Sequence, residues 1–261
     1  MTNPEMIARR LRLPGTQNVR DIGGYPTSDG GWTRWGLLLR GDSLQEVDDE
    51  GLTRLADYGL RTVIDLRTAA ERKAYADRLP RGVRLVAAPL LDSLSDGRPA
   101  GQSVQEEQAV TRLPDLADRY RYFVDQRGER IARALAELAR PGALPALVHC
   151  MAGKDRTGIV VALTLSALGV PDDVVAADYA ATDLFLGADF RAAATARAAA
   201  RGIDAAQYAR LLISEPGLIL GLLEYVRGQH GSARAFLASH GLASSELADL
   251  RGRLIAPDQG E

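Results

Sequence analysis

The residues best placed to do chemistry lie in one short segment, 149–158, which reads His-Cys-Met-Ala-Gly-Lys-Asp-Arg-Thr-Gly. A short apolar run typical of a buried strand precedes it, and a strongly apolar helical pattern follows it. A loop that leads from a strand into a helix presents backbone N–H groups without helical partners, and the helix dipole adds partial positive charge. The segment therefore predicts a binding site for an anion such as phosphate.

Cys150 lies at the base of this loop and is the only cysteine of the chain. The field that favours a bound anion also favours the thiolate, which is the nucleophilic form of cysteine. Arg156 closes the loop, and its planar guanidinium can hold two phosphate oxygens and the charge that develops on them. We expect Cys150 to be the nucleophile, and Arg156 the phosphate clamp, of a phosphomonoester hydrolase.

Other residues of the loop support this chemistry. Gly153 lets the backbone turn with its N–H inward, and the Thr157 hydroxyl is placed to donate to the sulfur. His149 is expected to hydrogen-bond the loop backbone rather than to act as a base. The expected phosphate-binding residues are Met151, Ala152, Gly153, Lys154, Asp155 and Arg156.

A general acid must protonate the leaving group, and the sequence offers two candidates. Asp155 lies inside the loop, and Asp92 follows a predicted strand at 83–88. A third interpretation leaves Asp155 as a support for Arg156 or for the segment 18–24. We favour a catalytic or orienting role for Asp155 and keep Asp92 as the alternative acid.

Lys154 is one of only two lysines among the 32 basic residues of the chain, and the other 30 are arginines. One interpretation is a solvated loop charge. The other is that a compact ammonium is kept here because a bulky guanidinium would crowd the anion site.

The segments around the loop predict an α/β fold with a largely parallel sheet, because strand and helix patterns alternate. Beyond residue 171 the chain is rich in Ala, Leu and Arg without a convincing strand, and glycines divide it into about five helices. The expected strands are 37–40, 61–66, 83–88 and 145–149; the expected helices are 48–58, a short one opened by a capping box of Thr68 and Glu71, 105–140 with a break near Gly128, and 157–168; the dividing glycines are Gly169, Gly202, Gly217, Gly228 and Gly241.

Polar residues follow several of these strands. Asp65 and Arg67 end one strand, as Cys150 and Asp92 follow others. Because ligands bind at the carboxyl ends of parallel strands, these groups should share one edge of the sheet. For Asp65 and Arg67 we favour a structural ion pair over a catalytic role.

Composition restricts the partners. A net charge of −2 gives no general attraction to nucleic acid or to anionic membranes. The longest apolar run, 158–170, is too short to span a bilayer, and the N-terminus lacks a signal-peptide pattern, so we expect a cytoplasmic protein, with non-classical secretion left open. One cysteine and three scattered histidines predict no disulfide, metal site or cofactor. The oligomeric state is not indicated.

The segment 149–158 resembles the phosphate-binding loop of the cysteine phosphatase superfamily, and specifically that of bacterial and fungal tyrosine phosphatases with Lys and Asp inside the loop. Secreted mycobacterial and Listeria phosphatases belong to that family. The segment 18–24, which contains Arg20 and Asp21, resembles its N-terminal signature, and 63–67 with Glu71-Arg72 resembles its first core strand and turn. The resemblance covers the chain to about Tyr179 and, more loosely, the helical remainder. Because the sequence has no repeat and no linker rich in Gly, Ser or Pro, we expect a single phosphatase domain over 1–261, with an α/β core at about 15–180 and a helical extension or lid at about 181–255.

The resemblance also implies an activity. Family members hydrolyse phosphotyrosine through a phosphocysteine, sometimes phosphoserine or phosphothreonine, and in several cases phosphoinositides, without a cofactor. Lys154 is similar to a lysine of lipid phosphatases. The expected partner is therefore a phosphorylated protein, with a phosphoinositide or a small phosphomonoester as alternatives. A phosphate-binding pseudophosphatase is disfavoured because Cys150, Asp155 and Arg156 are all present.

Residues 178–217 allow two interpretations. Their large apolar side chains either pack a helical layer, which we favour, or belong to a lid that folds back over the carboxyl edge of the sheet. The side chains in question are Phe185, Leu186, Phe190, Tyr208 and Leu211.

Overall fold

A five-stranded sheet forms the centre of the computed structural model, which describes residues 3–92, 115–200, 202 and 204–257. The strand order is β1-β3-β6-β4-β5; β1 is antiparallel to β3, and the other pairs are parallel. The predicted α/β fold is confirmed. The bounds are β1 Arg20–Asp21, β3 Leu38–Gly41, β4 Thr62–Asp65, β5 Arg84–Ala87 and β6 Ala146–His149.

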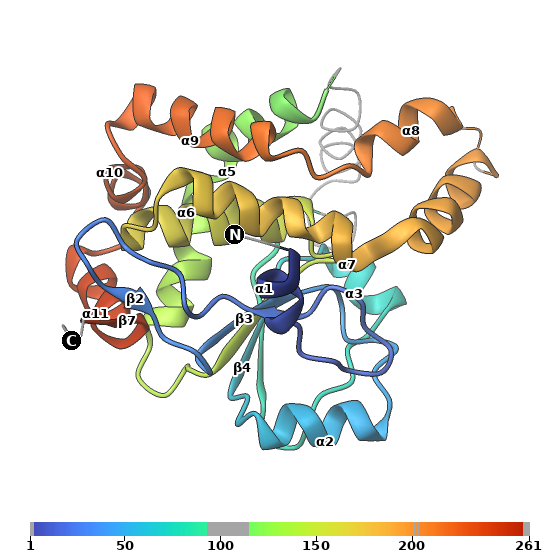
Figure 1. Ribbon diagram of the computed structural model, residues 1–261, viewed down its shortest axis with the longest axis horizontal. Helices are drawn as coiled ribbons and strands as arrows, with labels where there is room; N and C mark the ends of the chain where they lie inside the picture. The colour runs from blue at the N-terminus through green and yellow to red at the C-terminus, as the bar shows by residue number, and fades with distance from the viewer. Residues whose placement is uncertain (1–2, 93–114, 201, 203, 258–261) are drawn as a thin grey trace.

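Side chains alternate across the sheet, and each face has its own apolar core. Leu39, Val63 and Leu147 pack with Leu55 of α2 (Asp49–Asp57) on one face. On the other face, Ile64 and its neighbours pack against the helices that include α5 (Leu116–Ala139) and α6 (Asp155–Leu168). Figure 1 shows α2 on one side of β3 and β4, and α6, α7 and α9 on the other.

The helix after the loop lies in the middle of the larger core. Eleven residues of α6 are buried, and it contacts α5, α7, α9 and α10. This position confirms what its apolar sequence predicts. It ends at Gly169, whose φ of 95° is left-handed and costs glycine nothing. The remaining elements are α1 Asn3–Ala8, α3 Ala69–Ala74, α7 Asp172–Ala199, α8 Ala205–Leu211, α9 Pro216–His230, α10 Ala233–Ser239, α11 Ser244–Leu254, and the strand pair β2 Trp32–Thr33 and β7 Ile255–Ala256.

The glycine boundaries of the C-terminal half are partly wrong. Gly217 and Gly228 lie in the first and last turns of α9, within two residues of its ends, rather than between two helices. A glycine inside a helix costs only about 1 kcal/mol relative to alanine, so packing overrides it. Conversely, Gly187 kinks α7 with a φ of 67°. The break expected near Gly128 is present at Arg127, whereas residues 105–114 of that predicted helix lie outside the described residues.

The register places the carboxyl ends of the parallel strands side by side. His149 at the end of β6 is paired with Gly41 of β3 and with Asp65 of β4. Asp65 is paired in turn with Ala87 of β5. Cys150 and the Asp65–Arg67 pair therefore lie at one edge, as predicted. In the described part of the chain, no helix is both long and apolar enough to cross a membrane.

Candidate active site

The loop between β6 and α6 places a buried cysteine below a helix N-terminus. Cys150 is 3% exposed, and α6 begins at Asp155. Gly153 has a φ of 70°, and a Cβ there would lie 2.4 Å from the carbonyl of Gly41. No other residue fits this turn without movement of the strand beside it.

Donors from outside the loop hold four consecutive loop carbonyls. Each of these carbonyls lies within hydrogen-bond distance of a different group, and none of these groups lies between Cys150 and Arg156. The pairs are His149 Nδ1 with Cys150 O at 3.0 Å, Ser43 N with Met151 O at 3.1 Å, Asn18 Nδ2 with Ala152 O at 2.9 Å, and Arg40 Nη2 with Gly153 O at 2.8 Å.

This pattern decides where the loop N–H groups point. In a trans peptide the C=O and the following N–H point in opposite directions, and Leu144–Pro145 is the one cis bond among the described residues. With the carbonyls directed outward, the N–H groups of the residues from Met151 to Lys154 are directed to the inside of the loop. A cluster of inward N–H groups at a helix N-terminus binds an anion.

The segment 18–24 fixes the outer side of the loop. Arg20 donates to Asn18 and to Asp178, and Arg40 donates to Asp178 Oδ2 at 2.6 Å. Although burial alone would raise the pKa of Asp178, the two guanidiniums lower it to about 2. Asp21 binds elsewhere, accepting from Gly23 N, Gly36 N and the Tyr58 hydroxyl. Arg20 and Asp21 are thus structural ties, and Arg40 was not predicted at all.

A carboxylate orients the predicted phosphate clamp. Arg156 Nη1 and Nη2 donate to the two carboxylate oxygens of Glu71 at 2.6 and 2.7 Å. Glu71 also completes the capping box with Thr68 at the start of α3. Burial raises the pKa of Glu71, but the bonds from Arg156 outweigh it and lower the value to about 2. The capping box was visible in the sequence, but the contact with Arg156 was not, because it is tertiary.

Lys154 and Asp155 form a pair at the start of α6. Lys154 is 2% exposed, and its Nζ lies 2.6 Å from Asp155 Oδ1, so it is not a solvated loop charge. The Tyr120 hydroxyl donates to the same oxygen at 2.7 Å and lies 2.7 Å from the Tyr179 hydroxyl. Among the described residues the hydrogen bonds of Asp155 go to Lys154 and Tyr120, not to Arg156 or to 18–24.

Asp92 and Thr157, two residues with predicted catalytic roles, have contacts that the sequence did not indicate. Asp92 is buried and forms an ion pair with Arg130 of α5 at 2.5 Å. Thr157 is fully buried, and its hydroxyl has no hydrogen-bond partner among the described residues. The bond from Thr157 to the sulfur is therefore not formed in this structure.

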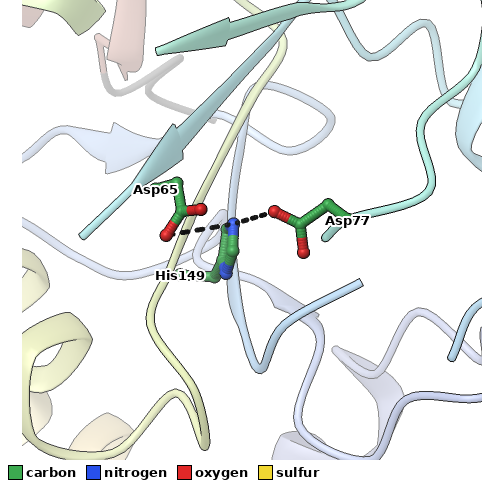
Figure 2. A group of neighbouring side chains, drawn as sticks. All are labelled: Asp65, Asp77 and His149. Atoms are coloured by element: carbon green, nitrogen blue, oxygen red, sulfur yellow. Dashed lines mark ion pairs between the residues drawn. The ribbon is translucent and has the colours of Figure 1, made fainter. Parts of the chain in front are cut away.

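Asp65 and Arg67 form an ion pair, which is the contact that the sequence predicts for them. Arg67 Nη2 lies 2.8 Å from Asp65 Oδ2 and 2.6 Å from Asp77 Oδ2, and all three groups are buried. Figure 2 shows Asp65 and Asp77 on either side of His149. Asp77 lies in a loop after α3, where nothing in the sequence distinguished it.

Comparison with known proteins agrees with this geometry. The chain is 36% identical to the triple specificity protein phosphatase PtpB of Mycobacterium tuberculosis over 191 residues, which are 64% of this chain and 67% of that protein. It is 29% identical to a tyrosine-protein phosphatase of Nostoc commune over 226 residues, or 83% of this chain and 74% of the relative. A sequence model of the tyrosine phosphatase family matches residues 11–256, so the chain belongs to the tyrosine phosphatase family.

Proposed function

We propose that this phosphatase uses Cys150 as its nucleophile on phosphate monoesters, with phosphotyrosine in proteins as its main substrate. The observation that carries the proposal is the set of four loop carbonyls bonded from outside, which turns the loop N–H groups inward above the thiol. Three phosphoryl oxygens need such donors in the transition state.

The first half-reaction transfers the phosphoryl group to sulfur. The Cys150 thiolate attacks phosphorus, the ester P–O bond breaks, and the leaving oxygen takes a proton from a general acid. Arg156 donates from one edge of its guanidinium to two equatorial phosphoryl oxygens, while another edge donates to the Glu71 carboxylate. In the second half-reaction water attacks phosphorus, the S–P bond breaks, and the water proton goes to the same acid–base group, which releases inorganic phosphate.

Asp155 is our preferred acid–base or orienting group. Its side chain is 39% exposed at the loop, whereas Oδ1 is held by Lys154 and Tyr120, which leaves Oδ2 for substrate or water. Asp92 remains the alternative, and its partner Arg130 would have to release it for proton transfer. The two assignments separate in the pH dependence of kcat for Asp155→Asn and Asp92→Asn. Substitution of the residue that acts as the acid should remove the fall of kcat at high pH.

Phosphoinositides are the second candidate substrate. The mycobacterial relative PtpB is named a triple specificity protein phosphatase, so that protein accepts more than one class of substrate. Lys154 adds a positive charge beside the anion site, although its ammonium is directed to Asp155. The domain layout, a lid over the site and the location in the cell stay predictions.

Replacement of the nucleophile tests the mechanism. Cys150→Ser should keep binding of vanadate and reduce turnover of an aryl phosphate to below about 1% of wild type, since a hydroxyl is not anionic at neutral pH. EDTA should leave the wild-type rate unchanged. Turnover by Cys150→Ser near the wild-type level contradicts the mechanism. A panel of phosphotyrosine peptides, phosphoinositides and small monophosphates then ranks the substrates by kcat/KM.

A further inference from the structure

His149 lies between two oxygen acceptors directly behind the nucleophile. Its imidazole is fully buried at the end of β6. Nδ1 lies 3.0 Å from the carbonyl oxygen of Cys150. Nε2 lies at ion-pair distance, 3.3 Å, from Asp77 Oδ2 and 4.0 Å from Asp65 Oδ1 (Figure 2). Each nitrogen of the ring therefore faces an oxygen that has no hydrogen to offer.

This geometry favours the doubly protonated ring. A neutral imidazole has one N–H and one lone pair, so one nitrogen would direct its lone pair at an oxygen lone pair. Only the imidazolium has an N–H on both nitrogens: Nδ1 then donates to the Cys150 carbonyl, and Nε2, whose N–H is not aligned for a hydrogen bond here, carries positive charge at ion-pair distance from Asp77. In a fully buried site a mismatched pair cannot be relieved by solvent.

The charges around the ring agree with an imidazolium. The groups that face it are the carboxyls of Asp42, Asp65 and Asp77 and the guanidinium of Arg67. Asp65 is committed to Arg67 through Nε, Nη2 and the backbone N–H. Burial lowers the pKa of His149, but the carboxylates of Asp77 and Asp65 outweigh burial and raise it above the ordinary value.

A metal ion is a weaker explanation of the same cluster. One ligand atom from each of Asp65, Asp77 and His149 lies within 4.8 Å of the others. However, the Arg67 guanidinium already binds both carboxylates, and a divalent cation would have to sit against it. A proton on His149 balances the cluster without displacing Arg67.

We propose that Asp77 is a positioning residue of the reaction, which holds His149 as an imidazolium and so places a fixed positive charge behind Cys150. The imidazolium donates to the carbonyl of the peptide that joins Cys150 to Met151. The N–H of that peptide points into the anion site, and donation to its oxygen makes this N–H a stronger donor. Both effects favour the thiolate over the thiol. The inference rests on the proposed function of Cys150.

The first test needs no substitution. The ring nitrogens of isotope-labelled histidine are followed by NMR between pH 5 and pH 9, with His230→Gln and His240→Gln used to assign the three histidines. His149 should show two protonated nitrogens at pH 7. A single neutral tautomer at that pH overturns the proposal. A shift of the His149 ring signals to those of a metal-bound imidazole on addition of zinc, reversed by EDTA, would identify a metal site and overturn it as well.

The second test measures the thiolate directly. Alkylation by iodoacetamide reports on Cys150 alone, because the chain has no other cysteine. Asp77→Asn should slow alkylation about five- to tenfold near pH 5 and less than about twofold near pH 9, because an opposite charge in contact is typically worth about a tenfold change in ionisation. An equal loss at both pH values would show a purely structural role and contradict the proposal.

A matched control separates Asp77 from the rest of the cluster. Asp65→Asn also breaks an ion pair with Arg67 but leaves the nearer carboxylate of His149 in place. It should slow alkylation near pH 5 by less than about threefold. Equal slowing by both variants overturns the specific role of Asp77. Neither measurement requires turnover, so these results stand or fall separately from the phosphatase activity that Cys150→Ser tests.

Discussion

The two halves of the phosphate-binding loop are fixed by different kinds of contact. In residues 150–153 the backbone is held, because four groups outside 150–156 lie within hydrogen-bond distance of its carbonyls. In residues 154–156 the side chains are held, because Lys154 pairs with Asp155 and Arg156 pairs with Glu71. The first half thus presents fixed N–H dipoles to an anion, and the second presents charged groups that meet the substrate.

This difference predicts different kinetic losses. Damage to the backbone half should weaken binding of every phosphate-like anion, because the N–H groups contact ground state and transition state alike. Damage to the side-chain half should lower kcat more than affinity, because these groups are positioned for the charge that develops during the reaction.

The largest effect is expected in the side-chain half, at the partner of the clamp. Glu71→Gln removes the charge that aligns the Arg156 fork and should lower kcat about ten- to hundredfold with little change in KM. Since the pKa of Glu71 is lowered to about 2, the pair is complete above the ordinary carboxyl range and weakens only as the pH falls toward that value. Sensitivity to the substitution should therefore be constant across neutral pH. A rise in KM with an unchanged kcat would show that Arg156 acts in substrate binding, as the backbone half does, and would contradict the comparison.

A smaller effect is expected in the backbone half. Asn18→Ala removes the donor to Ala152 O and the acceptor of Arg20, and one such hydrogen bond is worth about 1 kcal/mol net, or roughly a five- to tenfold change. We expect inhibition by vanadate and KM for an aryl phosphate to weaken by this factor together. Gln17→Ala is the control, because Gln17 contributes only a backbone N–H to this region, which the substitution keeps. Unchanged vanadate inhibition in Asn18→Ala would contradict the comparison.

The same division explains what the sequence could predict. The strands, α2 with its Asp48 cap, α6 and the chemistry of Cys150 and Arg156 follow from local patterns, because apolar runs, caps and the loop residues are contiguous. Apart from His149, the groups that hold the loop come from distant segments. Arg40 looks like any strand residue in an arginine-rich chain, and Tyr120 and Asp77 carry no local signal. Their roles arise only when the fold brings them together.

Lys154 tests whether the side-chain half recognises the substrate or only orders the site. Its ammonium is buried against Asp155, whose carboxylate is 39% exposed, so solvent screens the pair to about 1 kcal/mol. Lys154→Met should therefore lower kcat/KM for an aryl phosphate and for a phosphoinositide by a similar factor, about fivefold. The two substrates are assayed in parallel with matched detergent. A much larger loss on the phosphoinositide would show instead that Lys154 binds the head group.

The smallest kinetic effect is expected outside both halves, at Phe185. Its side chain is 6% exposed and packs in a cluster with Met6 and Ala181, and the guanidinium of Arg20 lies 5.1 Å from its ring centre. These contacts favour a packing role, so Phe185→Ala should destabilise the fold by about 3 kcal/mol and lower Tm by roughly 6–12 °C. KM and the rate of peroxide inactivation of Cys150 should change by less than about twofold.

The neighbouring Leu184 is the matched control for this substitution, because it lies on the same helix and is 40% exposed. Leu184→Ala should leave Tm within about 1 °C of wild type, since an exposed side chain loses little packing. The opposite pattern in Phe185→Ala is an unchanged Tm, an altered KM and a faster peroxide inactivation of Cys150. This pattern is what a lid would give, because the cover both contacts the substrate and limits the access of oxidant to the thiol. Arg20 links the two outcomes physically. It contacts both the Phe185 ring and Asn18, so a fall in Tm accompanied by weaker vanadate inhibition would mean that packing around α7 also supports the backbone half of the loop.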